Sequence, residues 1–261
     1  FFVNDAFGAC HRSHASTVGA AKLLRPAVMG FLVEDELEAL DALRGDPERP
    51  YVVVFGGAKV ADKIGLLEGM LARADRVLVG GAMANTFLAA SGCSMGRSLV
   101  EDDAVGAAER LLEQGGDRLG LPEDLVVAPG PEATSGVRSV PVDSVPDDAM
   151  ALDVGPRTRE TFAEAAASAR TLFWNGPLGY FERAPFAEGT RALARAAARA
   201  AGAGAFTVVG GGDSARAVRE AGVADRLSHV STGGGAALEY LEAGTLPALE
   251  ALEDADREET P

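Results

Sequence analysis

The stretch Ala205–Ala215, AFTVVGGGDSA, is the feature that most constrains the fold of this chain. Its apolar run, Phe206–Val209, favours a β-strand and stops at three consecutive glycines. Asp213 and Ser214 then open an alanine-rich pattern that is typical of a helix. A strand, a glycine turn and a helix in this order predict one repeat of an α/β fold.

The glycine loop also predicts what this repeat binds. Glycines let a ligand approach the backbone closely, and the N-terminus of the helix offers free N–H groups and partial positive charge to a phosphate. A carboxylate at Asp213 would repel a polyphosphate unless a divalent cation such as Mg²⁺ lies between them. We therefore interpret the loop as a site for a nucleotide complexed with metal, and Asp213 as the metal ligand.

Two other interpretations of this loop stay open. Glycine turns between strands and helices also occur for packing alone. The pattern Gly210-x-Gly212-x-x-Ala215 also fits the dinucleotide-binding fingerprint of an oxidoreductase. That fingerprint requires an acidic residue at the end of the next strand, but the next strand-like run, Leu227–Ser231, is followed by Thr232. The dinucleotide-binding domain therefore ranks second.

Composition limits the class of partner. The net charge of −15 disfavours nucleic acids and anionic membranes as partners. No apolar run approaches membrane-spanning length, and no signal peptide opens the chain. Cys10 and Cys93 lack metal-ligand spacing, which favours free thiols in the cytoplasm. Because Phe1 lies in the middle of a motif, we expect the chain to be a piece of a longer protein.

The strand and helix pattern repeats along the chain. Further strand-like runs lie at Tyr51–Phe55, Arg76–Val79, Leu125–Ala128, Ala151–Val154, Thr171–Trp174 and Leu227–Ser231. Their alternation with helical patterns predicts a mainly parallel sheet. Five runs end in glycines, at Gly56-Gly57, Gly80-Gly81, Gly176, Gly210–Gly212 and Gly233–Gly235. Because the carboxyl ends of parallel strands meet at one edge, we expect these loops to form a ligand-binding edge.

Lysine is rare and its positions are informative. Of the 24 basic residues only Lys22, Lys59 and Lys63 are lysines, and the last two follow Gly56-Gly57. A helix that begins near Ala58 would place Lys59 and Lys63 on one face at its positive end. Such stacking of like charges is locally unfavourable, and an anion would relieve it. We favour an anion-binding role over two solvated surface lysines.

Together these groups indicate phosphoryl transfer. Two cations, one acid for Mg²⁺ and several helix N-termini are the apparatus for positioning and neutralising transferring phosphate. No histidine or carboxylate in these loops is evidently placed to deprotonate a hydroxyl acceptor. A carboxylate acceptor, which is ionised at neutral pH, needs no such base. The GxxxxGK[ST] motif is missing, so the sequence does not predict a P-loop protein.

At this point the residues carry a resemblance to a known family. Seven segments resemble phosphoglycerate kinases, in order: FFVNDAFGACHRSHAS, GGAKVADKI, GGAMANTFL, DVGPRT, FWNGPLGYFE, GGGDSA and HVSTGGGAALEYLE. The resemblance implies a Rossmann-like, three-layer α/β/α domain with a mainly parallel six-stranded sheet. It also implies reversible transfer of the acyl phosphate of 1,3-bisphosphoglycerate to Mg-ADP, giving ATP and 3-phosphoglycerate in glycolysis.

The resemblance assigns roles residue by residue. It implies that Lys59, Gly211 and Gly234 are catalytic, that Arg12 binds 3-phosphoglycerate and that Asp213 binds Mg²⁺. The residues it implies for nucleotide binding are Gly57, Lys63, Gly80, Gly81, Gly155, Asn175, Pro177, Glu182, Gly211, Gly212, Asp213 and Ser214. Lys63 would contact the nucleotide phosphates, and Glu182 would bind the ribose hydroxyls.

The resemblance also predicts the domain organisation. It implies that residues 1–30 end an amino-terminal domain that binds 3-phosphoglycerate, that residues 31–44 form the interdomain helix and that residues 45–261 bind the nucleotide. Most of the amino-terminal domain is absent, so we expect the chain alone to bind Mg-nucleotide weakly and to transfer phosphate negligibly. A degenerate nucleotide-binding module without catalysis is the third possibility. The resemblance further implies a monomer.

Overall fold

The computed structural model describes residues 1–252, which divide into two compact units. The first unit contains Phe1–Pro47, Gly210–Gly212 and the described residues from Ser231 on, and the second contains Glu48–Val209 and Asp213–Val230. The predicted nucleotide-binding domain, 45–261, extends beyond the described residues, and its boundaries stay a prediction.

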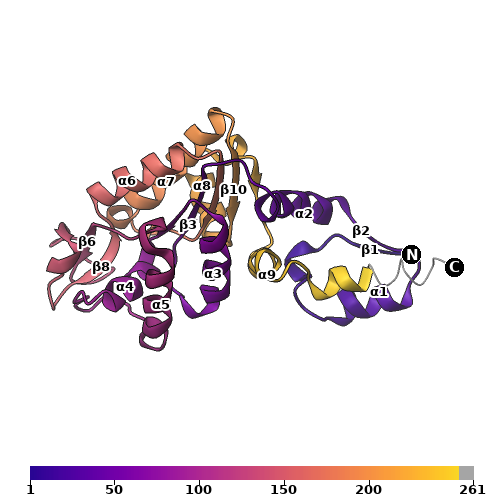
Figure 1. The fold of residues 1–261 in the computed structure, drawn as a ribbon, viewed down its shortest axis with the longest axis horizontal. Helices are drawn as coiled ribbons and strands as arrows, with labels where there is room; N and C mark the ends of the chain where they lie inside the picture. The colour runs from indigo at the N-terminus through magenta and orange to yellow at the C-terminus, as the bar shows by residue number, and fades with distance from the viewer. Residues whose placement is uncertain (253–261) are drawn as a thin grey trace. The chain divides into compact units, whose positions relative to one another are not determined.

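A six-stranded sheet forms the centre of the second unit (Figure 1). Its strand order is β11-β10-β9-β3-β4-β5, with bounds His229–Val230, Phe206–Gly210, Thr171–Asn175, Tyr51–Phe55, Arg76–Val79 and Leu119–Gly120. The pairs β10–β11, β9–β3, β3–β4 and β4–β5 are parallel. This arrangement confirms the predicted α/β class.

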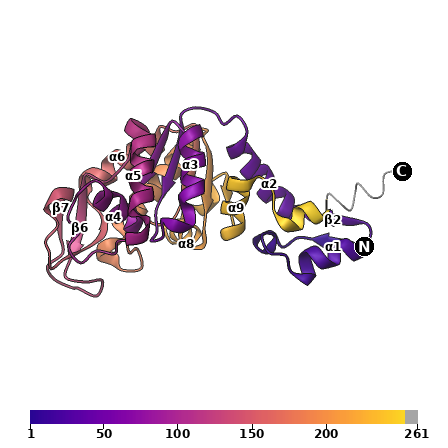
Figure 2. The same cartoon turned by 60° about the horizontal axis from the view of Figure 1, so that its bottom comes forward.

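Helices cover both faces of this sheet, which explains why its central strands are continuous apolar runs. Figure 1 shows α6 (Pro156–Ala167) and α7 (Glu188–Gly202) packed side by side, and Figures 1 and 2 show α4 (Gly81–Ala90) beside α5 (Val105–Gly115). Val52 and Val54 of β3 pack with Trp174 of β9 in one core. On the other face, Tyr51 donates a hydrogen bond to the Met70 sulfur of α3 (Ile64–Arg73) at 3.4 Å.

A second, smaller sheet changes the expected strand membership. The runs Leu125–Ala128 and Ala151–Val154, which we expected in the parallel sheet, lie in β6 (Asp124–Ala128) and β8 (Met150–Val154). Both pair antiparallel, with β7 (Arg138–Pro141) on the far side of β6. A parallel pair would need a crossover helix between the two strands, and none lies between β6 and β7. The two strands therefore pair antiparallel. The sixth strand of the main sheet is instead β5, which is too short for periodicity to reveal.

The loops after β3 and β9 are joined through their backbones. The N–H of Gly56 donates to the carbonyl of Asn175, and the N–H of Gly57 donates to the carbonyl of Pro177, each at 2.8 Å. The loop after β4 joins the same block, because the N–H of Gly81 donates to the carbonyl of Leu178 at 3.1 Å. Three strand-exit loops therefore form one continuous hydrogen-bonded edge.

This edge requires glycine at Gly176. The residue has a φ of +96°, and a Cβ added there would collide with the carbonyl oxygen of Gly56. A Cβ at Gly56 would in turn collide with the carbonyl oxygen of Pro177. The glycines at these strand ends therefore permit close approach of two backbones as well as an unusual dihedral angle.

The first unit is built on the predicted helix at residues 31–44. This helix, α2 (Phe31–Arg44), receives its amino-terminal cap from Asp5, whose carboxylate accepts from the N–H of Leu32 at 2.7 Å. The hydroxyl of Tyr240 in α9 (Gly235–Ala243) donates to Asp41 at 2.7 Å. Strands β1 (Phe2–Asn4) and β2 (Ala27–Met29) pair parallel beside short α1 (Ala20–Leu23).

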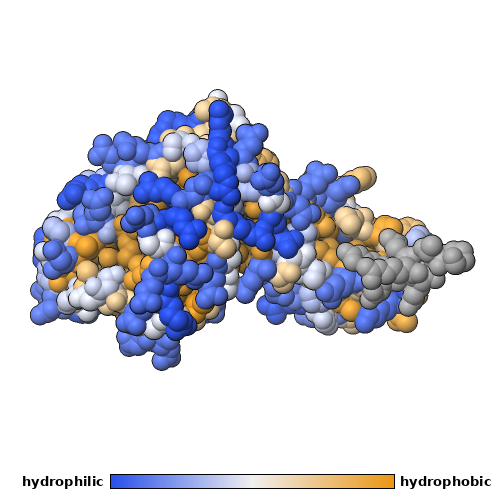
Figure 3. Space-filling model, in the orientation of Figure 1, coloured by the Kyte–Doolittle hydropathy of each residue, from blue (hydrophilic) through white to orange (hydrophobic). Residues whose placement is uncertain are grey.

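Several large apolar side chains of the first unit are exposed, and Figure 3 shows apolar surface on this unit. They include Phe1, Val3, Leu23, Val28, Met29 and Phe31. Both cysteines are free thiols, Cys10 buried and Cys93 half-buried. Within residues 1–252, no helix combines the length and hydrophobicity needed to cross a lipid bilayer.

We predict that Gly176→Ala lowers the free energy of unfolding by roughly 3 kcal/mol, because it adds a steric collision to an unfavourable φ. Gly92→Ala is the matched control, since Gly92 has a φ of +87° but open space around its Cβ position. Gly92→Ala should lower the free energy of unfolding by only about 1 kcal/mol. Urea denaturation followed by the fluorescence of Trp174 measures both, and equal losses would contradict the collision.

Candidate functional site

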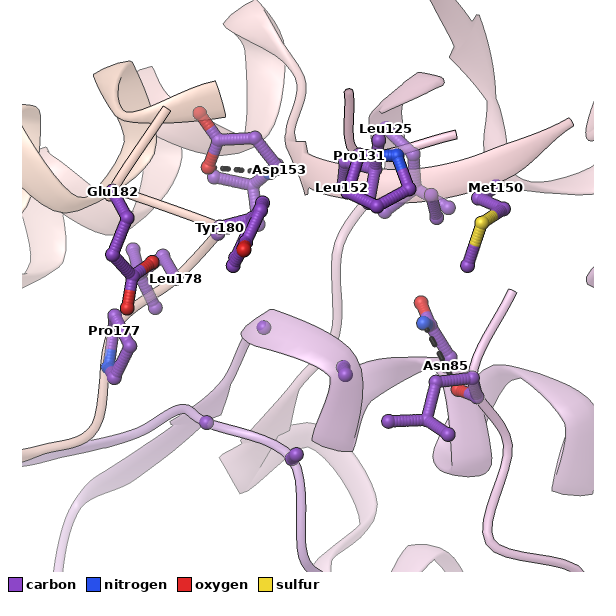
Figure 4. A pocket seen from close by; sticks show the side chains of 18 of the residues that line it. Asn85, Leu125, Pro131, Met150, Leu152, Asp153, Pro177, Leu178, Tyr180 and Glu182 are labelled. Carbon is purple, nitrogen blue, oxygen red and sulfur yellow. Dashed lines mark hydrogen bonds between the residues drawn. The ribbon is translucent and has the colours of Figure 1, made fainter. Parts of the chain in front are cut away.

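A cavity of about 350 Å³ lies where the strand-exit loops of the second unit meet the small sheet (Figure 4). Among its lining residues are Gly57, Gly81, Asn85, Leu99, Leu125, Pro131, Met150, Leu152, Asp153, Pro177, Tyr180, Glu182 and Asp213. Five of the predicted site residues are therefore brought together: Gly57, Gly81, Pro177, Glu182 and Asp213. Backbone glycines, an apolar wall and a few polar groups are the features of a pocket for a small organic ligand.

The cavity has two chemically different ends. Glu182 and Pro177 lie at one end, and Asn85 and Met150 lie at the other (Figure 4). The backbone bond between Pro177 and Gly57 connects the first end to the loop that carries the lysines. Leu125 and Met150 supply apolar surface from β6 and β8. A ligand with one charged end and one flat apolar end fits this distribution.

Lys63 is held beside the glycine edge by a hydrogen bond to the backbone. Its ammonium donates to the carbonyl of Gly56 at 3.1 Å. Partial removal from water lowers the Lys63 pKa to about 8, and the nearby carboxylates of Asp62 and Asp213 oppose this shift. The structure therefore brings Lys63 and Asp213 within electrostatic reach of each other, as the sequence predicted. A bound anion would offset the desolvation of the ammonium.

Lys59 differs from Lys63, and the predicted helix face is wrong. The chain forms a 3₁₀ turn at Ala61–Lys63, and α3 begins only after it, so Lys59 precedes the helix. The carboxylate of Glu101 accepts two backbone N–H bonds at the start of this turn, from Val60 at 2.6 Å and from Ala61 at 3.2 Å. Lys59 extends into solvent, 73% exposed, with Asp62 at 3.4 Å.

Other predicted residues support the edge and do not line the cavity. Ser214 is fully buried, and its hydroxyl accepts a hydrogen bond from the N–H of Gly176 at 2.6 Å. Gly155 leaves room for the carboxylate of Asp124, with which an added Cβ would collide. Asn175 is buried at the end of β9, and Gly80 follows β4. Their contacts with a ligand stay predictions.

Four predicted residues belong to the first unit: Arg12, Gly211, Gly212 and Gly234. The exposed Arg12 donates to the ring of its neighbour His11 at 3.2 Å. Gly211 and Gly234 have φ values of +91° and +53°, which glycine adopts without strain. Their predicted roles in binding and catalysis stay predictions.

Sequence reasoning missed the residues of the apolar end. Asn85 was one signal, because Asn85 and Thr86 are polar residues inside an otherwise apolar helical run. Leu125 and Met150 carried no signal, since their position in the cavity depends on the antiparallel pairing of β6 with β8.

The chemistry of the site suits a metal that arrives with its ligand. Within residues 1–252, no three histidine, cysteine or carboxylate side chains are grouped to hold a metal ion. Asp213 is a single exposed carboxylate on the wall of the cavity. Mg²⁺ commonly binds through one or two carboxylates together with substrate phosphates and water. Asp213 therefore fits Mg²⁺ bound to a nucleotide.

Comparisons with known proteins agree with this geometry. A phosphoglycerate kinase of Thermus thermophilus is 59% identical over 255 residues, covering 97% of this chain and 65% of the relative. That of Rubrobacter xylanophilus is 56% identical over 251 residues, covering 96% and 63%. The chain thus spans just under two thirds of the length of these curated relatives.

Solved structures give the same result. The structure of phosphoglycerate kinase from Coxiella burnetii matches with a TM-score of 0.90 at 42% identity, covering 97% of this chain and 65% of that one. The enzyme from Pyrococcus horikoshii matches with a TM-score of 0.86 at 36% identity, covering 98% and 64%. The family model described as phosphoglycerate kinase matches residues 1–244. This chain therefore belongs to the phosphoglycerate kinase family.

Proposed function

We propose that this chain is the nucleotide-binding part of a phosphoglycerate kinase. The reaction is the reversible transfer of the acyl phosphate of 1,3-bisphosphoglycerate to Mg-ADP, which gives ATP and 3-phosphoglycerate. One observation supports it most strongly: a single cavity joins an apolar slot to glycine backbones, with Asp213 on its wall and Lys63 within electrostatic reach of that carboxylate.

In the proposed reaction, some residues of the chain hold the nucleotide and another follows the phosphoryl group that is transferred. Lys63 binds the nucleotide phosphates from its place on the glycine edge, and Glu182 binds the ribose hydroxyls. Lys59 is exposed and therefore free to follow the phosphoryl group during transfer. Since the acceptor in the reverse reaction is an ionised carboxylate, no residue has to remove a proton from it.

Mg²⁺ held by Asp213 would neutralise phosphate charge during transfer. Gly211, Gly212 and Ser214 surround the start of α8 (Gly212–Glu220), whose N-terminus favours phosphate. In the first unit, Arg12 would bind 3-phosphoglycerate and Gly234 would present its N–H group to the transferring phosphate. These roles rest on the family motifs together with the cavity described above.

The resemblance and the net charge also suggest a cellular compartment, an oligomeric state and the partners of the protein. We place the reaction in the cytoplasm, with a monomer that engages neither nucleic acid nor membranes. Because the chain spans about 65% of the length of its relative from Thermus thermophilus, we expect negligible phosphate transfer from the 261-residue chain alone. Turnover of 3-phosphoglycerate and ATP at an ordinary enzymatic rate, about 10 s⁻¹, would contradict this expectation.

We predict that the chain binds ADP in a Mg²⁺-dependent way, and that Asp213→Ala and Lys63→Ala each weaken binding by roughly 10-fold or more, because each removes a charge-assisted contact. Isothermal titration calorimetry measures this, with Asp225→Ala and Lys22→Ala as exposed controls that should bind as the parent does. Binding of NAD that is indifferent to Mg²⁺ would instead support the dinucleotide-binding alternative.

We also predict that ADP affinity decreases as pH rises above about 8. Below this pH Lys63 is already charged in the free protein, whereas above it the group loses its proton and must regain one to bind phosphate. The decrease should approach tenfold per pH unit between about pH 8.5 and 9.5. Calorimetry at fixed free Mg²⁺ tests this prediction, and Lys63→Arg, which stays charged, should remove the dependence. An unchanged slope in that variant would assign the titration to another group.

A further inference from the structure

The apolar end of the cavity contains the buried amide of Asn85. This residue lies on α4, one helical turn beyond Gly81, and its side chain is 2% exposed. Its neighbours along the cavity wall include Leu99, Leu125 and Met150, which offer no polar side-chain group except the thioether sulfur of methionine. In Figure 4 Asn85 lies at the end of the cavity opposite Glu182.

The orientation of this amide follows from its hydrogen bond. The Asn85 amide nitrogen lies 3.1 Å from the backbone carbonyl of Leu99, which can only accept. The nitrogen must therefore face Leu99, and the oxygen Oδ1 must face the other way. Figure 4 shows this oxygen turned from the Leu99 bond toward the space below Met150. Within residues 1–252, Oδ1 has no hydrogen-bond donor.

A carbonyl oxygen without a donor, set in an apolar wall, is costly when a ligand displaces water from it. A ligand that brings an N–H group to this point avoids the cost. A ligand without such a group leaves the oxygen unsatisfied. A cavity with such an oxygen favours ligands that carry a hydrogen-bond donor at their apolar end.

The carboxylates of Asp153 and Glu182 do not take this role. Both carboxylate oxygens of Asp153 already accept backbone N–H bonds, from Gly189 at 2.8 Å and from Val154 at 2.9 Å. Burial raises the pKa of Asp153 to about 7. Glu182 lies at the end where the ribose is proposed to bind. Neither carboxylate thus replaces the Asn85 side chain as an acceptor at the apolar end.

We propose that Asn85 reads the nucleobase: its Oδ1 accepts a hydrogen bond from an exocyclic amino group, so that adenine is preferred over a purine without that group. This inference rests on the proposed nucleotide-binding function. With the phosphates near Lys63 and Asp213, the base extends toward the apolar end, where its flat ring packs between β8 and α4. The amino group then lies at the edge of the ring that meets Asn85.

The test compares two ligands that differ only in this group, ADP and purine riboside 5′-diphosphate. Calorimetry with Mg²⁺ on the 261-residue chain should show that purine riboside 5′-diphosphate binds about 3- to 10-fold more weakly than ADP. This difference corresponds to the loss of one hydrogen bond to a neutral acceptor. Asn85→Leu removes the acceptor at similar volume. We expect it to bind both ligands within twofold of each other. Leu99→Met, which changes the apolar wall alone, should keep the parent ratio.

Each outcome separates this inference from the proposed function. ADP binding with no discrimination in the parent chain overturns the reading of the base by Asn85 and leaves nucleotide binding intact. A ratio that persists in Asn85→Leu also overturns it. Failure of the parent chain to bind ADP overturns both. If circular dichroism shows that Asn85→Leu does not fold, the parent ratio and Asn85→Ser decide.

Discussion

The close approach of the backbones at Gly56 and Gly176 is the contact on which the rest of the site depends. It joins the ends of β3 and β9, which are more than a hundred residues apart in the chain but adjacent in the sheet. The carbonyl of Gly56 also accepts the hydrogen bond of Lys63. A single packing constraint thus determines the shape of the edge and the position of its half-buried cation, Lys63.

The two lysines show how local structure separates similar residues. Lys63 is half-buried, and its desolvation destabilises the charged form until an anion compensates. Lys59, four residues earlier, is exposed beside Asp62, and its ammonium stays hydrated. In the proposed reaction a buried cation suits a phosphate that is held, and an exposed one suits a phosphoryl group that moves. The helical turns begin only at Ala61, where the carboxylate of Glu101 accepts the first free N–H groups, so Lys59 lies before them.

The small antiparallel sheet supplies the apolar wall of the cavity. The glycine edge offers only backbone groups and charge, which suit any polyphosphate. Strands β6 and β8 add Leu125 and Met150, and these close a slot that ends at Asn85. In the proposed site, phosphate charge and the base would be bound by different parts of the second unit, so substitutions in one part should leave binding by the other largely intact.

The sequence by itself determined the α/β class, the glycine loops and the family, because strand periodicity and glycine turns are local properties of the chain. It also indicated that Lys59, Lys63 and Asp213 gather at one edge of the sheet, since all three follow parallel strands. Only the tertiary structure decided that β6 and β8 leave the main sheet and that Lys59 stands outside α3. It alone gave Asn85 its orientation, through the carbonyl of Leu99. These features depend on contacts between segments that are distant in sequence. A local sequence pattern indicates that a residue is buried, but it does not indicate which distant segment the residue packs against.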